Sequence, residues 1–283
     1  MIKSFIREKK IYCNDYLEVD IIPCFDMKCR GRKRKEKRSS HKQENLNDKN
    51  ARRYFIQKLN TNFGADDYHV TVTYKNVPET IEEAEKTVNN FLRRISYHRK
   101  KSNLPALKYI VVTESRENKI GKPIRIHHHI VMNGGISRDE IENLWRERRK
   151  KGEKKGKSIG FVNVDRLQPD EFGLEALGRY LTKSVNGRQR WRPSRNLKEP
   201  VVKKNDYRYS RRKVEQFAQA ADNWALWEKQ YPGYRLTNCN AEYRDETGWS
   251  IYIKMRRDTN DCKNSEKNKD EKNSRRETNP EAG

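Results

Sequence analysis

The feature that most constrains the fold is a pair of short segments on either side of a loop that contains glycine and proline. Residues 109–114 (YIVVTE) and 124–132 (IRIHHHIVM) have the length of strands, and the loop between them contains Gly121 and Pro123. This arrangement predicts two antiparallel strands joined as a hairpin. A hairpin that turns near residue 120 places Glu114 opposite residues 126 and 127.

Three of the six histidines are consecutive in the second of these strands, as His127, His128 and His129. Side chains on a strand alternate between its two faces, so His127 and His129 point to one face. His128 points to the other face, together with the apolar residues Ile126 and Ile130. We therefore expect His128 to lie in the core, and the two flanking histidines to share a polar face.

Two imidazoles separated by one residue on a strand can hold a divalent ion. Glu114, across the hairpin, adds an oxygen ligand, which favours Mg²⁺ or Mn²⁺ over a Zn²⁺ bound by nitrogen alone. Glu117 is the competing carboxylate and lies in the connecting loop. The alternative is a basic surface strand with ordinary histidines. The candidate metal ligands are thus Glu114, His127 and His129.

The rest of the chain alternates between strand-like and helix-like patterns, which indicates an α+β fold. Apolar residues at strand or helix spacing define the further elements. Strands are expected at 11–23, 68–74, 161–167, 234–243 and 249–255. Helices are expected at 47–60, 78–99, after Ser137, from Pro169 to Val185, and at 211–229.

Composition divides the chain into four segments. We expect a basic N-terminal segment with a short strand and helix (1–64), a central domain (65–190), a C-terminal helix and hairpin (191–256) and a polar tail (257–283). The tail lacks aromatic residues, so we predict that it is disordered. Alternating apolar residues in 249–255 favour a C-terminal hairpin that completes the central sheet over one that forms a separate domain.

The chain carries 64 Lys and Arg against 40 Asp and Glu, a formal net charge of +24. Such an excess attracts nucleic acid, because basic side chains neutralise phosphates and release counterions. Basic residues gather at 28–38, 146–157 and 188–213, and Tyr207 and Tyr209 could stack on unpaired bases. The residues that we expect to bind DNA are Arg30, Arg32, Lys33, Arg34, Lys35, Arg188, Arg190 and Trp191. Adhesion to acidic lipid and basic tails that bind nothing specific are the alternatives.

No apolar run in the sequence suggests a membrane protein. A transmembrane helix needs about 20 apolar residues, and no segment approaches that length. The N-terminal MIKSFIREKK also lacks the apolar core of a secretory signal. We therefore expect a cytoplasmic protein without membrane association.

A tyrosine and a lysine stand three positions apart in the helix predicted after Pro169. Tyr180 and Lys183 would share a face of this helix and could act on one phosphate. A phenol titrates near about pH 10, so a tyrosine nucleophile needs a metal-polarised phosphate and a nearby cation. Small residues at Ala176 and Ser184, and at Gly173 one turn earlier, would leave room for a DNA backbone. The alternative is a partly buried tyrosine of the core.

The order of YHVTVTY, TES with RIHHHIVMNG, and GRYLTKS resembles the three motifs of rolling-circle replication initiators of the HUH endonuclease superfamily, of the phage and plasmid type. The resemblance covers roughly residues 65–190. It implies an antiparallel sheet of about five strands with helices packed on one face. It also implies metal ligation by Glu114, His127 and His129, attack by Tyr180 and assistance by Lys183.

The resemblance further implies the reaction and its partners. These are site-specific nicking and joining of single-stranded DNA at a replication origin, a 5′-phosphotyrosine intermediate, and a host polymerase and helicase. Two residues depart from the family pattern: Ser184 stands where some relatives carry a second tyrosine, and His128 stands at a position that is usually apolar. A register shifted by one residue would make His128 the ligand. The alternatives are a plasmid-mobilisation relaxase or tyrosine transposase of the same superfamily, and a non-enzymatic nucleic-acid-binding protein.

Overall fold

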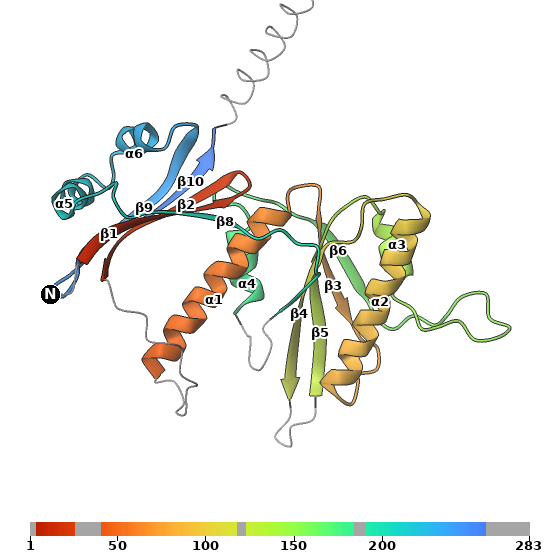
Figure 1. Ribbon diagram of the computed structural model, residues 1–283. Coiled ribbons are helices and arrows are strands. Elements are labelled where there is room, and N and C mark those ends of the chain that lie inside the picture. The colour runs from red at the N-terminus through yellow and green to blue at the C-terminus, as the bar shows by residue number, and fades with distance from the viewer. Residues whose placement is uncertain (1–3, 26–40, 118–122, 184–190, 259–283) are drawn as a thin grey trace, which may run out of the picture. The chain divides into compact units, whose positions relative to one another are not determined.

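The chain forms two compact units in a computed structural model (Figure 1). One unit comprises residues 1–38 and 200–283, and the other comprises residues 39–199. The structure describes residues 4–25, 41–117, 123–183 and 191–258. Each unit contains a five-stranded antiparallel sheet, which confirms the predicted α+β class and the predicted type of sheet.

The first unit combines strands from both ends of the chain, in the order β8-β1-β2-β10-β9. Its strands are β1 (Ser4–Cys13), β2 (Tyr16–Phe25), β8 (Val201–Asn205), β9 (Tyr234–Arg244) and β10 (Gly248–Arg257). Its helices are α5 (Arg211–Gln219) and α6 (Trp224–Gln230). The C-terminal hairpin therefore pairs with β2, where Ile251 faces Ile21, and does not complete the sheet that carries the histidines.

Two elements of this unit differ from the sequence prediction. The strand expected at 11–23 is a hairpin, because Asn14 adopts a positive φ of 56° and turns the chain between β1 and β2. Asparagine tolerates this left-handed conformation better than most residues. The helix expected at 211–229 is interrupted before Asn223, whose side chain accepts a hydrogen bond from the Leu226 N–H and starts α6.

The second unit carries the histidine strand in a sheet of order β6-β3-β5-β4-β7. Its strands are β3 (Tyr68–Thr73), β4 (Tyr109–Glu117), β5 (Pro123–Met132), β6 (Val162–Arg166) and β7 (Arg192–Pro193). Its helices are α1 (His41–Asn62), α2 (Ile81–Lys101), α3 (Arg138–Asn143) and α4 (Glu175–Leu181). The predicted hairpin of β4 and β5 is confirmed, with Glu114 directly opposite His127.

Helices cover both faces of this sheet, whereas the resemblance implied one. Figure 1 shows α1 and α4 on one side of β4 and β5, and α2 on the other. Val70 and Ile130 pack against Phe91 of α2. On the opposite face, Val112 packs in one cluster with Phe55 of α1. Both faces are apolar because neighbouring residues of β4 and β5 alternate between two separate cores.

Helix α4 is shorter than predicted and lies close against α1. It begins at Glu175, because Gly173 adopts a positive φ of 73° just before it. A Cβ at Gly173 would lie 2.5 Å from Asn60 Oδ1, and one at Gly178 would lie 2.6 Å from Ile56 Cγ1. Gly173 therefore serves the packing against α1, and the prediction that it leaves room for DNA is wrong.

Some sequence predictions fall outside the described residues. These are the basic stretch at 28–38 and the polar tail from residue 259 onwards. Among the helices that the structure describes, none is both long enough and apolar enough to cross a membrane.

Candidate functional site

Three side chains of the central hairpin converge on one point. Glu114 Oε2 lies 3.3 Å from His127 Nε2 and 3.9 Å from His129 Nε2. One ligand atom from each residue lies within 4.8 Å of the other two. The short connection between β4 and β5 fixes this register, so local sequence suffices to bring the three residues together. The cluster could hold a metal ion.

The surroundings of His129 fit a metal ligand. This side chain is buried, with 4% of its surface exposed. Within the described part of the chain, no group hydrogen-bonds its Nε2 atom. A buried polar nitrogen without a partner is costly, and coordination of a cation would relieve that cost. Two imidazole nitrogens and one carboxylate oxygen form a donor set suited to a divalent ion.

A further histidine, His69, supports the cluster from β3. Its Nε2 atom lies 3.2 Å from His129 Nδ1, and the two rings stack with centroids 5.3 Å apart. Thr71 Oγ1 lies 3.2 Å from the same Nδ1 atom. Contacts at one imidazole nitrogen orient the ring and leave the other nitrogen for a ligand. Alternation in β3 places His69 on the same face as Thr71, but only the pairing of β3 with β5 shows what this face meets.

The two stacked histidines are held in their neutral form. Burial, together with the neighbouring His69 and His127, lowers the pKa of His129 to about 4. Burial also lowers the pKa of His69, while the carboxylate of Asp165 opposes that change. The neutral imidazole is the form that binds metals, so His129 is ready to coordinate at neutral pH.

His128 faces the opposite core, as predicted. It is fully buried, and its Nδ1 and Nε2 atoms lie 2.9 Å from Thr113 Oγ1 and 2.7 Å from Tyr74 Oη. Burial, with a smaller contribution from Arg192, lowers the pKa of His128 to about 3. Because both ring nitrogens are engaged inside the protein, the alternative in which a shifted register makes His128 the ligand is wrong.

Tyr180 projects from α4 onto the metal-ligand cluster. Its ring meets the His129 ring edge to face, with centroids 5.5 Å apart, and 56% of the residue is exposed. The alternative of a core tyrosine is therefore wrong. An open pocket of about 600 Å³ lies here and is lined by, among others, His69, Arg125, His127, His129 and Tyr180. The site offers a phenol beside a candidate metal centre in a space large enough for part of a nucleotide chain.

Lys183 lies just beyond the end of α4. The helix ends at Leu181, Thr182 is its C-cap, and the Lys183 N–H donates to the Tyr180 carbonyl at 3.2 Å. The expected shared helical face is thus not formed, although the backbone bond keeps Lys183 next to Tyr180. Its side chain is exposed.

The other expected site residues are only partly described. Arg30, Arg32, Lys33, Arg34, Lys35, Arg188 and Arg190 lie outside the described residues, as does the side chain of Glu117. Trp191 is half-buried and its ring packs 4.8 Å from that of Phe55. Tyr207 is 98% exposed, but Tyr209 is buried, so the prediction that Tyr209 stacks on bases is wrong.

Comparison with known families agrees with the geometry. Residues 67–186 match the family model for the replication-associated protein ORF2. The matched segment contains Glu114, His127, His129, Tyr180 and Lys183, and it supports the resemblance to rolling-circle replication initiators. No curated protein and no solved structure matches the chain.

Proposed function

We propose that this protein initiates rolling-circle replication by nicking and rejoining single-stranded DNA through Tyr180. The observation that carries the proposal is the edge-to-face contact of the Tyr180 ring with His129, one of three residues that could hold a metal ion. A tyrosine that is exposed beside such a cluster is placed for chemistry rather than for packing.

Each residue then has a part in the reaction. Glu114, His127 and His129 hold Mg²⁺ or Mn²⁺, which the carboxylate ligand favours over Zn²⁺. When bound, the ion polarises the scissile phosphate. The Tyr180 phenol loses its proton and its oxygen forms a bond to phosphorus, while the bond to the 3′ oxygen breaks and that oxygen takes a proton. Lys183 contacts a phosphate oxygen.

The product explains the partners and the reversal. A 5′-phosphotyrosine link leaves a free 3′ hydroxyl, which a host polymerase extends while a host helicase opens the duplex. Attack by a 3′ hydroxyl on the phosphotyrosine restores the phosphodiester and releases Tyr180. Ser184 stands where some relatives carry a second tyrosine, so a second copy of the chain supplies any second nucleophile.

The test is covalent capture of DNA. Purified protein is incubated with labelled single-stranded DNA from the cognate replicon and Mn²⁺, and adducts are separated on a denaturing gel. We expect an adduct with the native chain and with the control Tyr97→Phe, whose tyrosine is 73% exposed on α2, but none with Tyr180→Phe. An adduct that persists in Tyr180→Phe refutes the assignment of the nucleophile.

A second variant tests the metal ligands. The double substitution His127→Ala, His129→Ala should abolish cleavage and leave DNA binding in place, as should a chelator. Cleavage that survives either treatment refutes the metal centre. DNA binding without any adduct, under all metal conditions, would instead support a non-enzymatic DNA-binding protein. A relaxase or transposase shares this chemistry, and dependence of replicon copy number on Tyr180 separates an initiator from both.

A further inference from the structure

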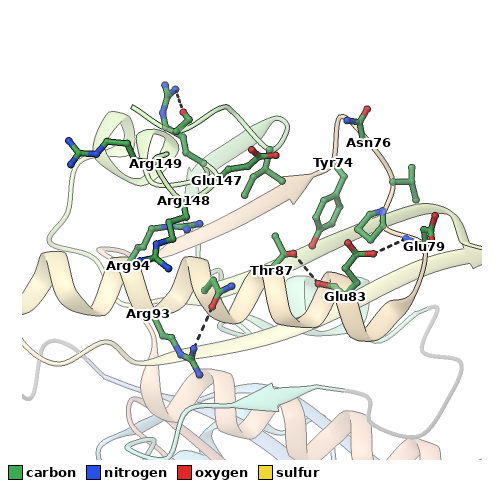
Figure 2. A pocket seen from close by; sticks show the side chains of 16 residues that line it. Tyr74, Asn76, Glu79, Glu83, Thr87, Arg93, Arg94, Glu147, Arg148 and Arg149 are labelled. Carbon is green, nitrogen blue, oxygen red and sulfur yellow. Dashed lines mark hydrogen bonds between the residues drawn. The ribbon is translucent and has the colours of Figure 1, made fainter. Parts of the chain in front are cut away.

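A second pocket lies beside α2, on the face of the sheet away from Tyr180. It has a volume of about 920 Å³ and lies between α2 and the segment 146–159, with Tyr74 at the end of β3 in its wall. Figure 2 shows its charged side chains, with Arg94 and Arg148 toward one end and Glu79 and Glu83 toward the other. The arginine end is therefore separated from the acidic end.

Two arginines of this pocket carry buried N–H groups that lack an acceptor. Arg94 Nε donates to the Leu144 carbonyl at 3.0 Å, while its Nη2 has no hydrogen-bond partner in the described part of the chain. Arg146 donates from Nη2 to Asn143 Oδ1 at 3.2 Å, and its Nε likewise lacks a partner among the described residues. Charged donors held in place without an acceptor favour an anion with several oxygens, such as a phosphate.

The acidic end of the pocket is already engaged by the protein. Glu83 Oε2 accepts a hydrogen bond from the Glu79 N–H at 3.1 Å, at the start of α2. The Glu83 N–H in turn donates to the Thr80 side chain. These carboxylates therefore serve the beginning of the helix and leave the arginine end for a ligand.

An exposed aromatic residue lies between this pocket and the Tyr180 site. Phe161 is 83% exposed, yet two hydrogen bonds hold it to Thr73: the Thr73 N–H donates to its carbonyl at 2.9 Å, and its N–H donates to Thr73 Oγ1 at 3.3 Å. Thr73 lines the pocket that contains Tyr180, and the next residue, Tyr74, lines the arginine pocket. A fixed aromatic face that is open to solvent is the form of a platform for base stacking.

We infer that single-stranded DNA runs from the Tyr180 site across Phe161 to the arginine pocket. One base stacks on Phe161, and a backbone phosphate binds to Arg94, Arg146 and Arg148. This path holds DNA that flanks the cleaved bond, and to that extent it rests on the proposed function. Binding along it requires neither metal nor Tyr180.

The test measures binding of a fluorescently labelled oligo-dT in the presence of EDTA, so that no cleavage occurs. Arg148 is exposed, so Arg148→Gln should fold normally and serves as the principal variant. We expect weaker binding and a salt dependence of log K reduced by about 0.7, the value for one phosphate contact on single-stranded DNA. Lys100→Gln, which removes an exposed charge from the same α2 helix outside the pocket, is the matched control.

Phe161 gives an independent readout. Phe161→Ala should weaken binding about 5- to 150-fold without changing the salt dependence, and Phe161→Trp should restore it. The inference is overturned if Arg148→Gln matches Lys100→Gln in affinity and salt dependence, or if Phe161→Ala binds like the native chain. It is also overturned if inorganic phosphate protects the pocket while the oligonucleotide does not, because the pocket then takes a free anion. Loss of the covalent adduct with these binding results intact would refute the proposed function alone.

Discussion

Acid should destabilise the histidine-bearing unit because His128 cannot take up a proton while it is folded. This side chain is fully buried, and Thr113 and Tyr74 engage its two ring nitrogens. Its pKa is lowered from 6.5 to about 3 in the folded chain. The unfolded chain therefore binds a proton below pH 6.5 that the folded chain excludes. The stability contributed by His128 is fully present above that pH and is lost as the pH falls.

The size of the effect at pH 5 follows from these values. The folded pKa of about 3 keeps His128 neutral at pH 5, so only the unfolded chain is protonated there. Each pH unit below the unfolded pKa then costs about 1.36 kcal/mol, and the 1.5 units between pH 6.5 and pH 5 give about 2 kcal/mol. Such a loss is a sizeable part of the about 5–15 kcal/mol that stabilises a typical domain.

Urea unfolding at pH 7.5 and pH 5 tests this, with pulse-labelling hydrogen exchange of β3 and β5 peptides to report on this unit separately from the other. His128→Gln removes the titrating group and should lose about 2 kcal/mol less than the native chain on acidification. His129 titrates equally in both proteins and cancels. His98→Gln, on α2, should keep the native difference. An equal loss in His128→Gln and the native chain would refute the reasoning.

Three further substitutions test separate contacts. His69→Gln should weaken Mn²⁺ binding about 10-fold by calorimetry, because it removes the ring that contacts His129 Nδ1, and unchanged affinity would contradict this. Gly178→Val should lower the free energy of unfolding by about 1–3 kcal/mol, because its Cβ would meet Ile56 Cγ1 at 2.6 Å. Adding Ile56→Ala should recover part of that loss. Arg99→Met should cost about 2–3 kcal/mol in thermal unfolding, because it leaves three loop carbonyls without their donor, and a native Tm would argue against this.

Most of the metal-ligand geometry could be predicted from the sequence because it is local. The alternation of a strand separates His127 and His129 from His128, and a short loop fixes the register of Glu114 against His127. Helix starts were equally predictable. The Ser137 side chain accepts from the Glu140 N–H and completes a capping box at the start of α3.

Local breaks in regular structure were harder to predict. The sequence around Asn14 and Gly173 continues an apolar pattern on both sides, yet each residue adopts a positive φ. Apolar periodicity averages over several residues, so it cannot locate a single residue that turns the chain. Both the β1–β2 turn and the late start of α4 follow from such residues.

Tertiary structure alone decided which distant segments meet. His69 reaches His129 only because β3 pairs with β5, and the Tyr180 ring reaches His129 only because α4 packs on α1. The C-terminal hairpin pairs with β2, although its alternation would suit either sheet. Periodicity sets which face of a strand or helix is apolar, but the choice of partner depends on complementary packing between faces that lie far apart in the sequence. The sequence thus determined the metal ligands, and the fold decided that a tyrosine and a fourth histidine would join them.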